Sequence, residues 1–201
     1  MKTYKIHLIR HGLTDANLDG RYIGSKSDVP LSAAGVDELR LLKENTEYPH
    51  IDCLYTSPML RCRQTAAVLF PDFEPSQVEN LKEFDFGDFE GKTALQLEAN
   101  PAFADWASGK LETVPNGEST REFTKRICLG FNEVVRDMMQ NGKNEAAVIM
   151  HGGAIMMLLS ATAVPRRQTV EWTSENGKGY SVLVTPSLYH SSGIIEVYDI
   201  I

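Results

Sequence analysis

The sequence has few of the residues that build disulfide frameworks or membrane spans. Three of its 201 residues are cysteine (Cys53, Cys62 and Cys128), and their number and spacing match no disulfide or metal-site pattern. No stretch reaches the roughly 18 apolar residues that a membrane span requires. The apolar stretch near the N-terminus is too short for a signal peptide. We therefore expect reduced thiols, a cytoplasmic location and no membrane partner.

Positive charge is also scarce. The chain has 20 Lys and Arg residues against 27 Asp and Glu residues, which gives a formal net charge of −7. This balance disfavours nucleic acid as a partner, because such binding requires a cationic face. It does not exclude a small anionic substrate, since a pocket needs only two or three local cations. The hydrophobic share of 42% and the charged share of 23% are typical of globular proteins. The length predicts a single domain over residues 1–201.

Several common motifs of catalysis and cofactor binding are missing. The chain has no Gly-x-x-x-x-Gly-Lys-Ser/Thr loop, no Gly-x-Gly-x-x-Gly opening a helix and no Gly-x-Ser-x-Gly turn. It also lacks the pair of histidines four residues apart that typifies zinc proteases. These absences argue against nucleotide-binding loops, serine-hydrolase chemistry and a metal centre. We accordingly predict no cofactor and no metal.

The segments that are present alternate between strand and helix patterns. Strands are predicted at 4–9, 51–56, 146–150, 180–185 and 194–198, the last two as an antiparallel pair around a turn region at 191–193. Helices are predicted from Ser32 to before Pro49, over 59–70, over 93–107 with a break near Pro101, after Ser119, and over 154–163. This alternation predicts an α/β fold. We expect a three-layer α/β/α sandwich whose sheet is mainly parallel, with an antiparallel edge.

Two of the helix starts carry clear signals. Ser57 followed by Pro58 is typical of an N-cap with proline in the first helical position. Ser119 with Glu122 three residues later fits a capping box. After Ser119, apolar residues recur at helical spacing, which predicts the longest helix: Phe123, Ile127, Phe131, Val134, Val135 and Met138.

Candidate functional residues follow three of the predicted strands. Arg10 and His11 come directly after the first strand, Arg61 lies one turn into the helix after the second, and His151 and Gly152 follow strand 146–150. The carboxyl ends of parallel strands meet at one sheet edge, where α/β proteins bind ligands. Two arginines, two imidazoles and a helix N-terminus suit a phosphoryl group. Each residue alone is more often structural, so both interpretations stay open from these residues by themselves. Hydrolysis by an imidazole nucleophile is the simplest use of the set.

The same residues fall within motifs of a known family. Residues 8–17, 22–32, 55–66, 81–91, 115–119 and 150–153 resemble, in this order, the sequence blocks of the histidine phosphatase superfamily, which has the phosphoglycerate mutase-like fold. The first block reads Leu-Ile-Arg-His-Gly-Leu-Thr-Asp-Ala-Asn and the last reads Met-His-Gly-Gly. The resemblance covers most of the chain.

The resemblance implies a role for each matching residue. His11 is implied as the nucleophile that becomes phosphohistidine, and Glu83 as the general acid and then the general base. The phosphoryl oxygens would be held by Arg10, Arg61 and His151, with Asn17, Ile23, Gly24 and Gly152 lining the same pocket. The superfamily reaction needs no metal.

Departures from the family pattern indicate which branch of the superfamily this chain resembles. Many members carry Glu or Gln where this chain has Leu13, and the mutases carry Glu-Arg-His-Tyr-Gly where it has 83–87 as Glu-Phe-Asp-Phe-Gly. Between Gly91 and Pro115 the basic residues are Lys92 and Lys110, whereas the mutases have an insertion with paired arginines. The chain therefore resembles the short phosphatase branch, which includes α-ribazole phosphatase.

We expect a phosphatase acting on a small phosphorylated metabolite. Two alternatives are a bisphosphoglycerate-dependent phosphoglycerate mutase and a non-catalytic module that binds a phosphorylated ligand. Arg21 and Lys26 are either solvated or in contact with a distal anion of the substrate. Four aromatic residues belong either to the core or to a specificity pocket: Phe84, Phe86, Phe89 and Trp106. Neither the natural substrate nor the oligomeric state follows from these motifs.

Overall fold

A seven-stranded sheet runs through the centre of the molecule. The computed structural model describes residues 2–201. Its strands are β1 (Tyr4–Arg10), β2 (Cys53–Thr56), β3 (Ser76–Gln77), β4 (Glu145–Met150), β5 (Ala163–Val164), β6 (Gly179–Val184) and β7 (Ile195–Ile200), in the sheet order β3-β2-β4-β1-β6-β7-β5. Neighbouring strands are parallel except around β6, which is antiparallel to both β1 and β7. The predicted α/β class, with a mainly parallel sheet, is confirmed.

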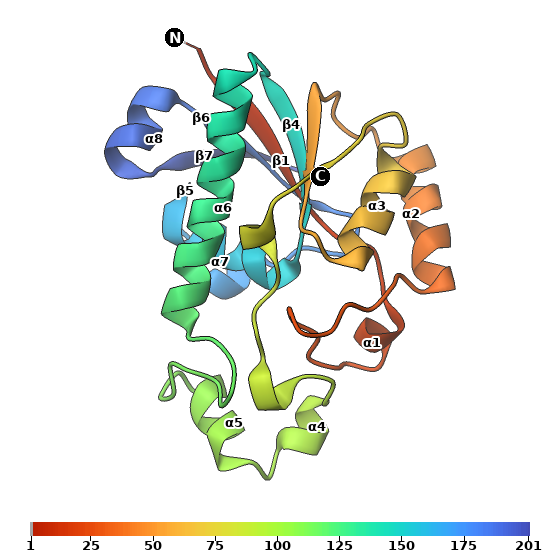
Figure 1. Cartoon of the computed structure of the whole chain (residues 1–201), viewed down its shortest axis with the longest axis vertical. Coiled ribbons are helices and arrows are strands. Elements are labelled where there is room, and N and C mark those ends of the chain that lie inside the picture. The colour runs from red at the N-terminus through yellow and green to blue at the C-terminus, as the bar shows by residue number, and fades with distance from the viewer. Residues whose placement is uncertain (1) are drawn as a thin grey trace.

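Helices cover both faces of this sheet (Figure 1). One face packs against α2 (Ala33–Asn45) and α3 (Leu60–Leu69), and the other against α6 (Thr120–Gln140), α7 (Gly152–Thr162) and α8 (Pro186–Ser192). Successive side chains of a strand point to opposite faces. In β1, Ile6 and Leu8 accordingly join the core under α6 and α7, while Ile9 joins the core under α2 and α3. The result is the expected three-layer sandwich.

The short helices lie beyond the carboxyl ends of the central strands (Figure 1). They are α1 (Asp15–Leu18), α4 (Ala94–Leu97) and α5 (Pro101–Ala107), with 3₁₀ turns at Glu79–Leu81, Gly87–Phe89 and Thr169–Trp172. Pro101 occupies the first turn of α5, so the predicted break in this helical stretch is confirmed. These segments form the surroundings of the sheet edge where the candidate residues lie.

The longest helix starts as its sequence predicts. The Ser119 hydroxyl accepts the Glu122 N–H at 3.1 Å, and the Glu122 carboxylate accepts the Ser119 N–H at 3.0 Å. This capping box satisfies two backbone donors that the first turn leaves unpaired. No helix within residues 2–201 is long and apolar enough to cross a membrane.

Two local predictions were wrong. Helix α3 begins at Leu60 with Met59 as its N-cap, rather than after Ser57, and no side chain caps it. The Ser57 hydroxyl instead lies 2.8 Å from Nε2 of His151, so a contact within the site replaces the local cap. The predicted turn region at 191–193 is the end of a helix that was not predicted: α8 (Pro186–Ser192) has Pro186 in its first turn and Gly193, with φ of 68°, as its C-cap.

Candidate active site

The two candidate histidines lie next to each other at the sheet edge. Arg10 is the last residue of β1 and pairs in register with Met150, the last residue of β4. His11 and His151 directly follow these two residues. Their ring centroids are 5.3 Å apart in an edge-to-face arrangement, and the His11 N–H donates to the Met150 carbonyl at 2.9 Å. Strand pairing therefore sets the spacing between two residues that are far apart in the chain.

The protonation of the His11 ring follows from one hydrogen bond. Nδ1 lies 2.7 Å from the carbonyl oxygen of Gly12. A carbonyl can only accept, so Nδ1 carries the hydrogen and Nε2 keeps its lone pair. The side chain is only 5% exposed. Burial, followed by the nearby charge of Arg61, lowers the pKa of His11 to about 3. At neutral pH the ring is therefore an uncharged imidazole with a free nucleophilic nitrogen.

Arg61 is a buried cation beside this ring. Its side chain is 1% exposed, and its Nη1 and Nη2 donate to the carbonyls of Ser27 at 3.0 Å and Gly24 at 3.2 Å. These two bonds attach the guanidinium to the loop between α1 and α2. A Cβ at Gly24 would lie 1.9 Å from the Phe84 carbonyl, so this close approach requires glycine.

Two predicted site residues contribute through the same loop. The Gly24 N–H donates to Oε2 of Glu90 at 3.1 Å. That N–H is therefore used within the protein, and Gly24 serves the site by accepting from Arg61. Ile23 precedes it and is half-buried.

Arg10 lies against the first turn of α7. Its Nη1 donates to the Ser174 carbonyl at 2.7 Å, and its buried Nε has no partner among the described residues. A Cβ at Gly152 would lie 3.2 Å from that Nε, so the glycine leaves room for the guanidinium. Burial lowers the pKa of Arg10, and the charge of Glu83 opposes this effect. Arg10 thus brings unpaired donors to the N-terminus of α7.

His151 is completely buried between Ser57 and Cys62. Its Nε2 lies 2.8 Å from the Ser57 hydroxyl and 3.6 Å from the Cys62 sulfur. Burial, followed by the charge of Arg61, lowers the pKa of His151 well below its ordinary value. The second histidine is therefore also uncharged, and its orientation is fixed by a neighbour that the sequence had indicated as a helix cap.

Glu83 is a buried carboxyl on the other side of α7's first turn. Its side chain is 8% exposed, Oε1 accepts the Phe84 N–H at 2.9 Å, and Oε2 accepts the Gly153 N–H at 3.0 Å. Burial raises the pKa of Glu83, while these N–H groups and the two arginines oppose the rise. The carboxyl therefore keeps its proton to higher pH than an exposed one, as a proton donor requires.

The remaining predicted residues lie around this centre. Asn17 belongs to α1, and its Oδ1 accepts the N–H and the hydroxyl of Thr14 at 3.2 and 3.0 Å. Its amide N–H groups remain as donors. Arg21 is paired with Asp19 at 3.0 Å and with the Gly91 carbonyl at 2.8 Å. Lys26 is paired with Asp85 at 3.2 Å. Both of these cations thus have protein partners.

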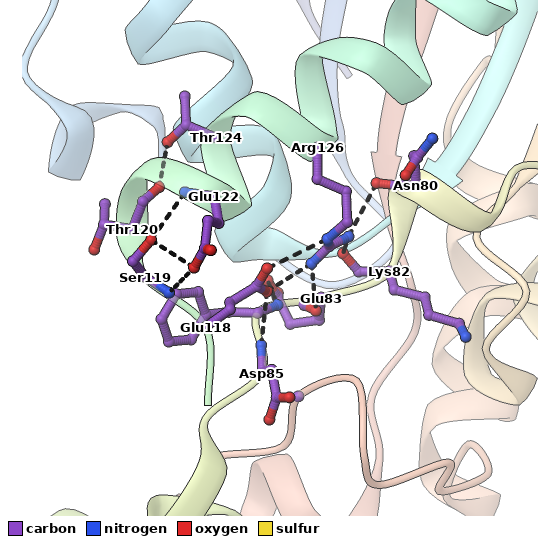
Figure 2. A network of polar contacts seen from close by, with 12 residues as sticks. Asn80, Lys82, Glu83, Asp85, Glu118, Ser119, Thr120, Glu122, Thr124 and Arg126 are labelled. Atoms are coloured by element: carbon purple, nitrogen blue, oxygen red, sulfur yellow. Dashed lines mark hydrogen bonds and ion pairs between the residues drawn. The ribbon is translucent and has the colours of Figure 1, made fainter. Parts of the chain in front are cut away.

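A network behind Glu83 was not found from the sequence (Figure 2). Arg126 of α6 donates to the carbonyls of Asn80 at 3.0 Å, Lys82 at 2.9 Å and Glu83 at 3.2 Å. Its Nη2 also bonds Glu118 at 2.6 Å, and the same Glu118 oxygen accepts the Asp85 N–H at 2.8 Å. The backbone on both sides of Glu83 is therefore held by one ion pair.

One sequence signal could have identified Arg126. It lies within the apolar stripe of the longest helix, three residues after Phe123 and next to Ile127. An arginine in such a stripe is drawn partly into the interior, where it needs carbonyl or carboxylate partners; Arg126 is half-buried. Thr65 was missed as well; its hydroxyl accepts the Gly12 N–H at 2.9 Å and donates to the Arg61 carbonyl at 2.7 Å.

The assembled site is suited to a doubly charged phosphate ester. Two guanidinium groups, two neutral imidazoles and the N-terminus of α7 surround one position, with a protonatable carboxyl beside it. Within residues 2–201, no group of three or more His, Cys, Asp and Glu side chains is arranged to hold a metal ion.

Comparison with known proteins gives the family. The model of the histidine phosphatase superfamily (branch 1) matches residues 6–186. The chain belongs to this superfamily. The resemblance seen in the sequence motifs is confirmed, and so is the expectation of a histidine phosphatase enzyme.

Individual relatives agree with this assignment. The chain is 32% identical over 155 residues to the Bacillus subtilis protein named "Uncharacterized phosphatase PhoE". This match covers 76% of this chain and 74% of the relative. It is 27% identical over 161 residues to the adenosylcobalamin/alpha-ribazole phosphatase of Salmonella typhimurium, and this match covers 78% of each chain. The crystal structure of a phosphoglycerate mutase from Bacillus anthracis superposes with a TM-score of 0.77 at 22% identity, covering 98% of this chain and 92% of that one. The last comparison confirms the phosphoglycerate mutase-like fold.

Proposed function

We propose that the protein is a metal-independent phosphatase that hydrolyses a small phosphomonoester through a phosphohistidine on His11. The observation that carries this proposal is the bond from His11 Nδ1 to the Gly12 carbonyl, which leaves Nε2 as a free nucleophile between two arginines. The relatives named as phosphatases, including the adenosylcobalamin/alpha-ribazole phosphatase, support the same reaction class.

The first step transfers the phosphoryl group to the histidine. Nε2 of His11 attacks phosphorus, the bond from phosphorus to the ester oxygen breaks, and Glu83 gives its proton to the departing oxygen. Arg10, Arg61 and the N-terminus of α7 stabilise the charge on the phosphoryl oxygens. The ring N–H of neutral His151 donates to the same oxygens. The products of this step are an alcohol, phosphohistidine and ionised Glu83.

The second step releases phosphate. Ionised Glu83 takes a proton from a water molecule whose oxygen attacks phosphorus, and the bond between phosphorus and Nε2 breaks. Glu83 is then protonated again and His11 is neutral, as at the start. One carboxyl serves as acid and then as base, which requires a pKa close to the working pH. The burial of Glu83 moves its pKa in that direction.

The charge pattern favours hydrolysis over mutase activity. A mutase must hold a second phosphate group within the same pocket, and this needs further cations. Arg21 and Lys26 are engaged with Asp19 and Asp85. We therefore place isomerisation of phosphoglycerate second, and expect release of inorganic phosphate to exceed any transfer between 3- and 2-phosphoglycerate.

The test is hydrolysis of 4-nitrophenyl phosphate in excess EDTA. We expect turnover by the intact chain to be unchanged by EDTA, and His11→Ala to lower kcat by about 10³-fold or more. Loss of activity in EDTA that a divalent ion restores would contradict the proposal.

A quench experiment separates an enzyme from a binding module. Rapid denaturation during turnover is expected to trap phosphate on His11 that is stable in base and labile in acid. His11→Ala provides the matched negative control. A protein that binds phosphate esters but yields no such adduct and no alcohol would be the non-catalytic module instead.

A further inference from the structure

An apolar pocket of about 380 Å³ opens beside Glu83. This volume lies within the range of small-molecule pockets, about 300–1,000 Å³. Aromatic side chains form much of its wall: Tyr22, Phe84, Phe86, Trp106 and Phe123. The thioether side chains of Met156 and Met157, from α7, complete one side. The predicted mechanism uses none of these seven residues.

The pocket lies on the leaving-group side of the reaction. Glu83 and Gly153 line it, and they are joined by the 3.0 Å bond from the Gly153 N–H to Oε2. The phosphoryl group must lie at His11 and the arginines, whereas the ester oxygen must lie at the Glu83 carboxyl that protonates it. The organic group attached to that oxygen therefore continues from Glu83 into the pocket.

The wall of the pocket is held in place by contacts between its own rings. Phe86 packs against Phe84 with centroids 5.0 Å apart, against Tyr22 at 5.3 Å and against Trp106 at 5.9 Å, mostly edge to face. Phe84 also packs against Phe123 at 5.2 Å. Such pairs stabilise each other beyond simple burial. The pocket therefore does not need to be formed by the substrate.

The lining also determines what the pocket rejects. No Lys, Arg or His belongs to the wall, and its acidic group is Glu83. A leaving group with an ammonium or carboxylate would lose hydration here without gaining a partner. A carboxylate or second phosphate would in addition lie near the Glu83 carboxyl after its proton has been transferred.

We propose that this pocket binds the leaving group of the substrate, and that this group is an uncharged alcohol carrying an aromatic ring or a similar apolar body. The proposal rests on the proposed function of the site and specifies its substrate class. Amino-acid, carboxylate and bisphosphate substrates are disfavoured by the same wall.

The experiment compares three esters of primary alcohols, so the chemistry of the leaving oxygen is similar. They are 2-phenylethyl phosphate, ethyl phosphate and phosphoserine. We expect kcat/KM for the phenylethyl ester to exceed that for the ethyl ester by about 100-fold, because even one methylene in an apolar pocket changes it by about 10-fold or more. For phosphoserine, we expect the lowest kcat/KM of the three esters.

Variants of the pocket wall test whether the preference for the phenylethyl ester arises in this pocket. Met157→Ser is expected to lower the ratio of kcat/KM between the phenylethyl and ethyl esters by about tenfold, since apolar contact is lost. Met156→Ser is a second variant of the same wall. Met139→Ser is the matched control, because Met139 packs half-buried against the same core away from the pocket. A ratio of two substrates is independent of the fraction of the protein that is folded.

The outcomes distinguish the two levels of the proposal. Equal kcat/KM for the ethyl and phenylethyl esters, or a preference for phosphoserine, overturns the pocket assignment while phosphohistidine on His11 still forms. Absence of hydrolysis for all three esters, together with no phosphohistidine, overturns both the proposed function and the pocket assignment. Retention of the wild-type ratio by both methionine variants also overturns the pocket assignment.

Discussion

At the scale of single residues, the same burial prepares two groups for opposite tasks. Burial disfavours the charged form of any side chain. It therefore lowers the pKa of His11 to about 3, which leaves a neutral imidazole for the proposed role of nucleophile, and raises the pKa of Glu83, which favours the neutral carboxyl for the proposed role of acid. The positive charges that the site needs come from the guanidinium groups of Arg10 and Arg61. This division of roles explains why the site contains both imidazoles and arginines.

The role of Glu83 is tested with leaving groups of different basicity. Glu83→Gln is expected to slow hydrolysis of ethyl phosphate by about 10²–10⁴-fold, because the departing alkoxide receives no proton. With 2,4-dinitrophenyl phosphate, whose leaving oxygen needs no proton, the same variant is expected to release one dinitrophenolate per active site rapidly and then stop. The measurement is stopped-flow absorbance combined with quantification of phosphohistidine.

The burst separates the two duties of the carboxyl. Water attack still needs the base, so the phosphorylated enzyme accumulates in the variant but not in the intact chain. Equal slowing of both substrates without a burst would show that Glu83 acts only by holding structure. The basic limb of the pH profile for ethyl phosphate is expected to reflect loss of the Glu83 proton, at a pH above the ordinary carboxyl range.

At the scale of elements, the site is fixed by where strands end and by what α6 contributes. β1 and β4 are adjacent and parallel, so the residues that follow them meet. Helix α7 begins at Gly152 directly after β4, which brings its N-terminus to the same edge. Helix α6 supports the acid from behind, through Arg126 and three backbone carbonyls (Figure 2).

Arg126 is expected to act as a positioning residue for the acid. Arg126→Met removes five hydrogen bonds around Glu83, and we expect it to lower kcat for ethyl phosphate by about tenfold and stability by about 2 kcal/mol. With 2,4-dinitrophenyl phosphate, the rate of the burst phase should fall by a smaller factor, because release of dinitrophenolate needs no acid. A purely structural role would lower both rates equally.

A matched control exists on the same helix. Arg136 is exposed and has the same side chain, so Arg136→Met should leave both the kinetics and the stability near those of the intact chain. If the two variants behave alike, the network in Figure 2 does not position Glu83.

The elements also show how far sequence reasoning extends. The capping box at Ser119 and the break at Pro101 depend on local chemistry, and both were predicted correctly. Ser57 carried an equally clear local signal, but its hydroxyl bonds to His151, a residue distant in sequence. Arg126 had no motif, because its partners are backbone carbonyls that exist only once the chain has folded. Local signals are therefore reliable where no tertiary partner competes for the same atom.

At the scale of the whole molecule, the interior and the surface differ in charge. The net charge of −7 is spread over the chain as a whole, whereas the centre contains two arginines and three buried neutral histidines, His7, His11 and His151. Burial is the main cause that lowers the pKa of each histidine. In the unfolded chain the same groups titrate near pH 6.5. Their protonation is therefore linked to folding.

The linkage predicts a loss of stability in mild acid. Below pH 6.5 the unfolded state takes up protons on these histidines while the folded state does not, so the free energy of unfolding falls as pH falls. Above pH 6.5 their contribution is fully present. For His11, whose pKa is lowered to about 3, the contribution is about 1.4 kcal/mol per pH unit below its unfolded pKa. Glu83 opposes this trend, since its raised pKa lets the folded state take up a proton first.

The measurement is urea unfolding at pH 7, 6 and 5 in a buffer without phosphate. We expect a declining free energy of unfolding for the intact chain, and a slope about 1.4 kcal/mol per pH unit shallower for His11→Gln. An unchanged slope in the variant would mean that His11 is protonated in the folded state at these pH values.

The position of β1 in the sheet has a consequence for synthesis of the chain. β1 leaves the ribosome well before both of its neighbours, β4 and β6, which come from the last third of the sequence. Until then both edges of β1 offer unpaired backbone groups to any other strand. Arg10 and His11 meanwhile lack three groups that they contact in the folded chain: the His151 ring, the Ser174 carbonyl and helix α7. A nascent or truncated chain that ends before β4 thus carries most of the family's sequence motifs without their chemistry, and its β1 is free to pair with a strand of another chain.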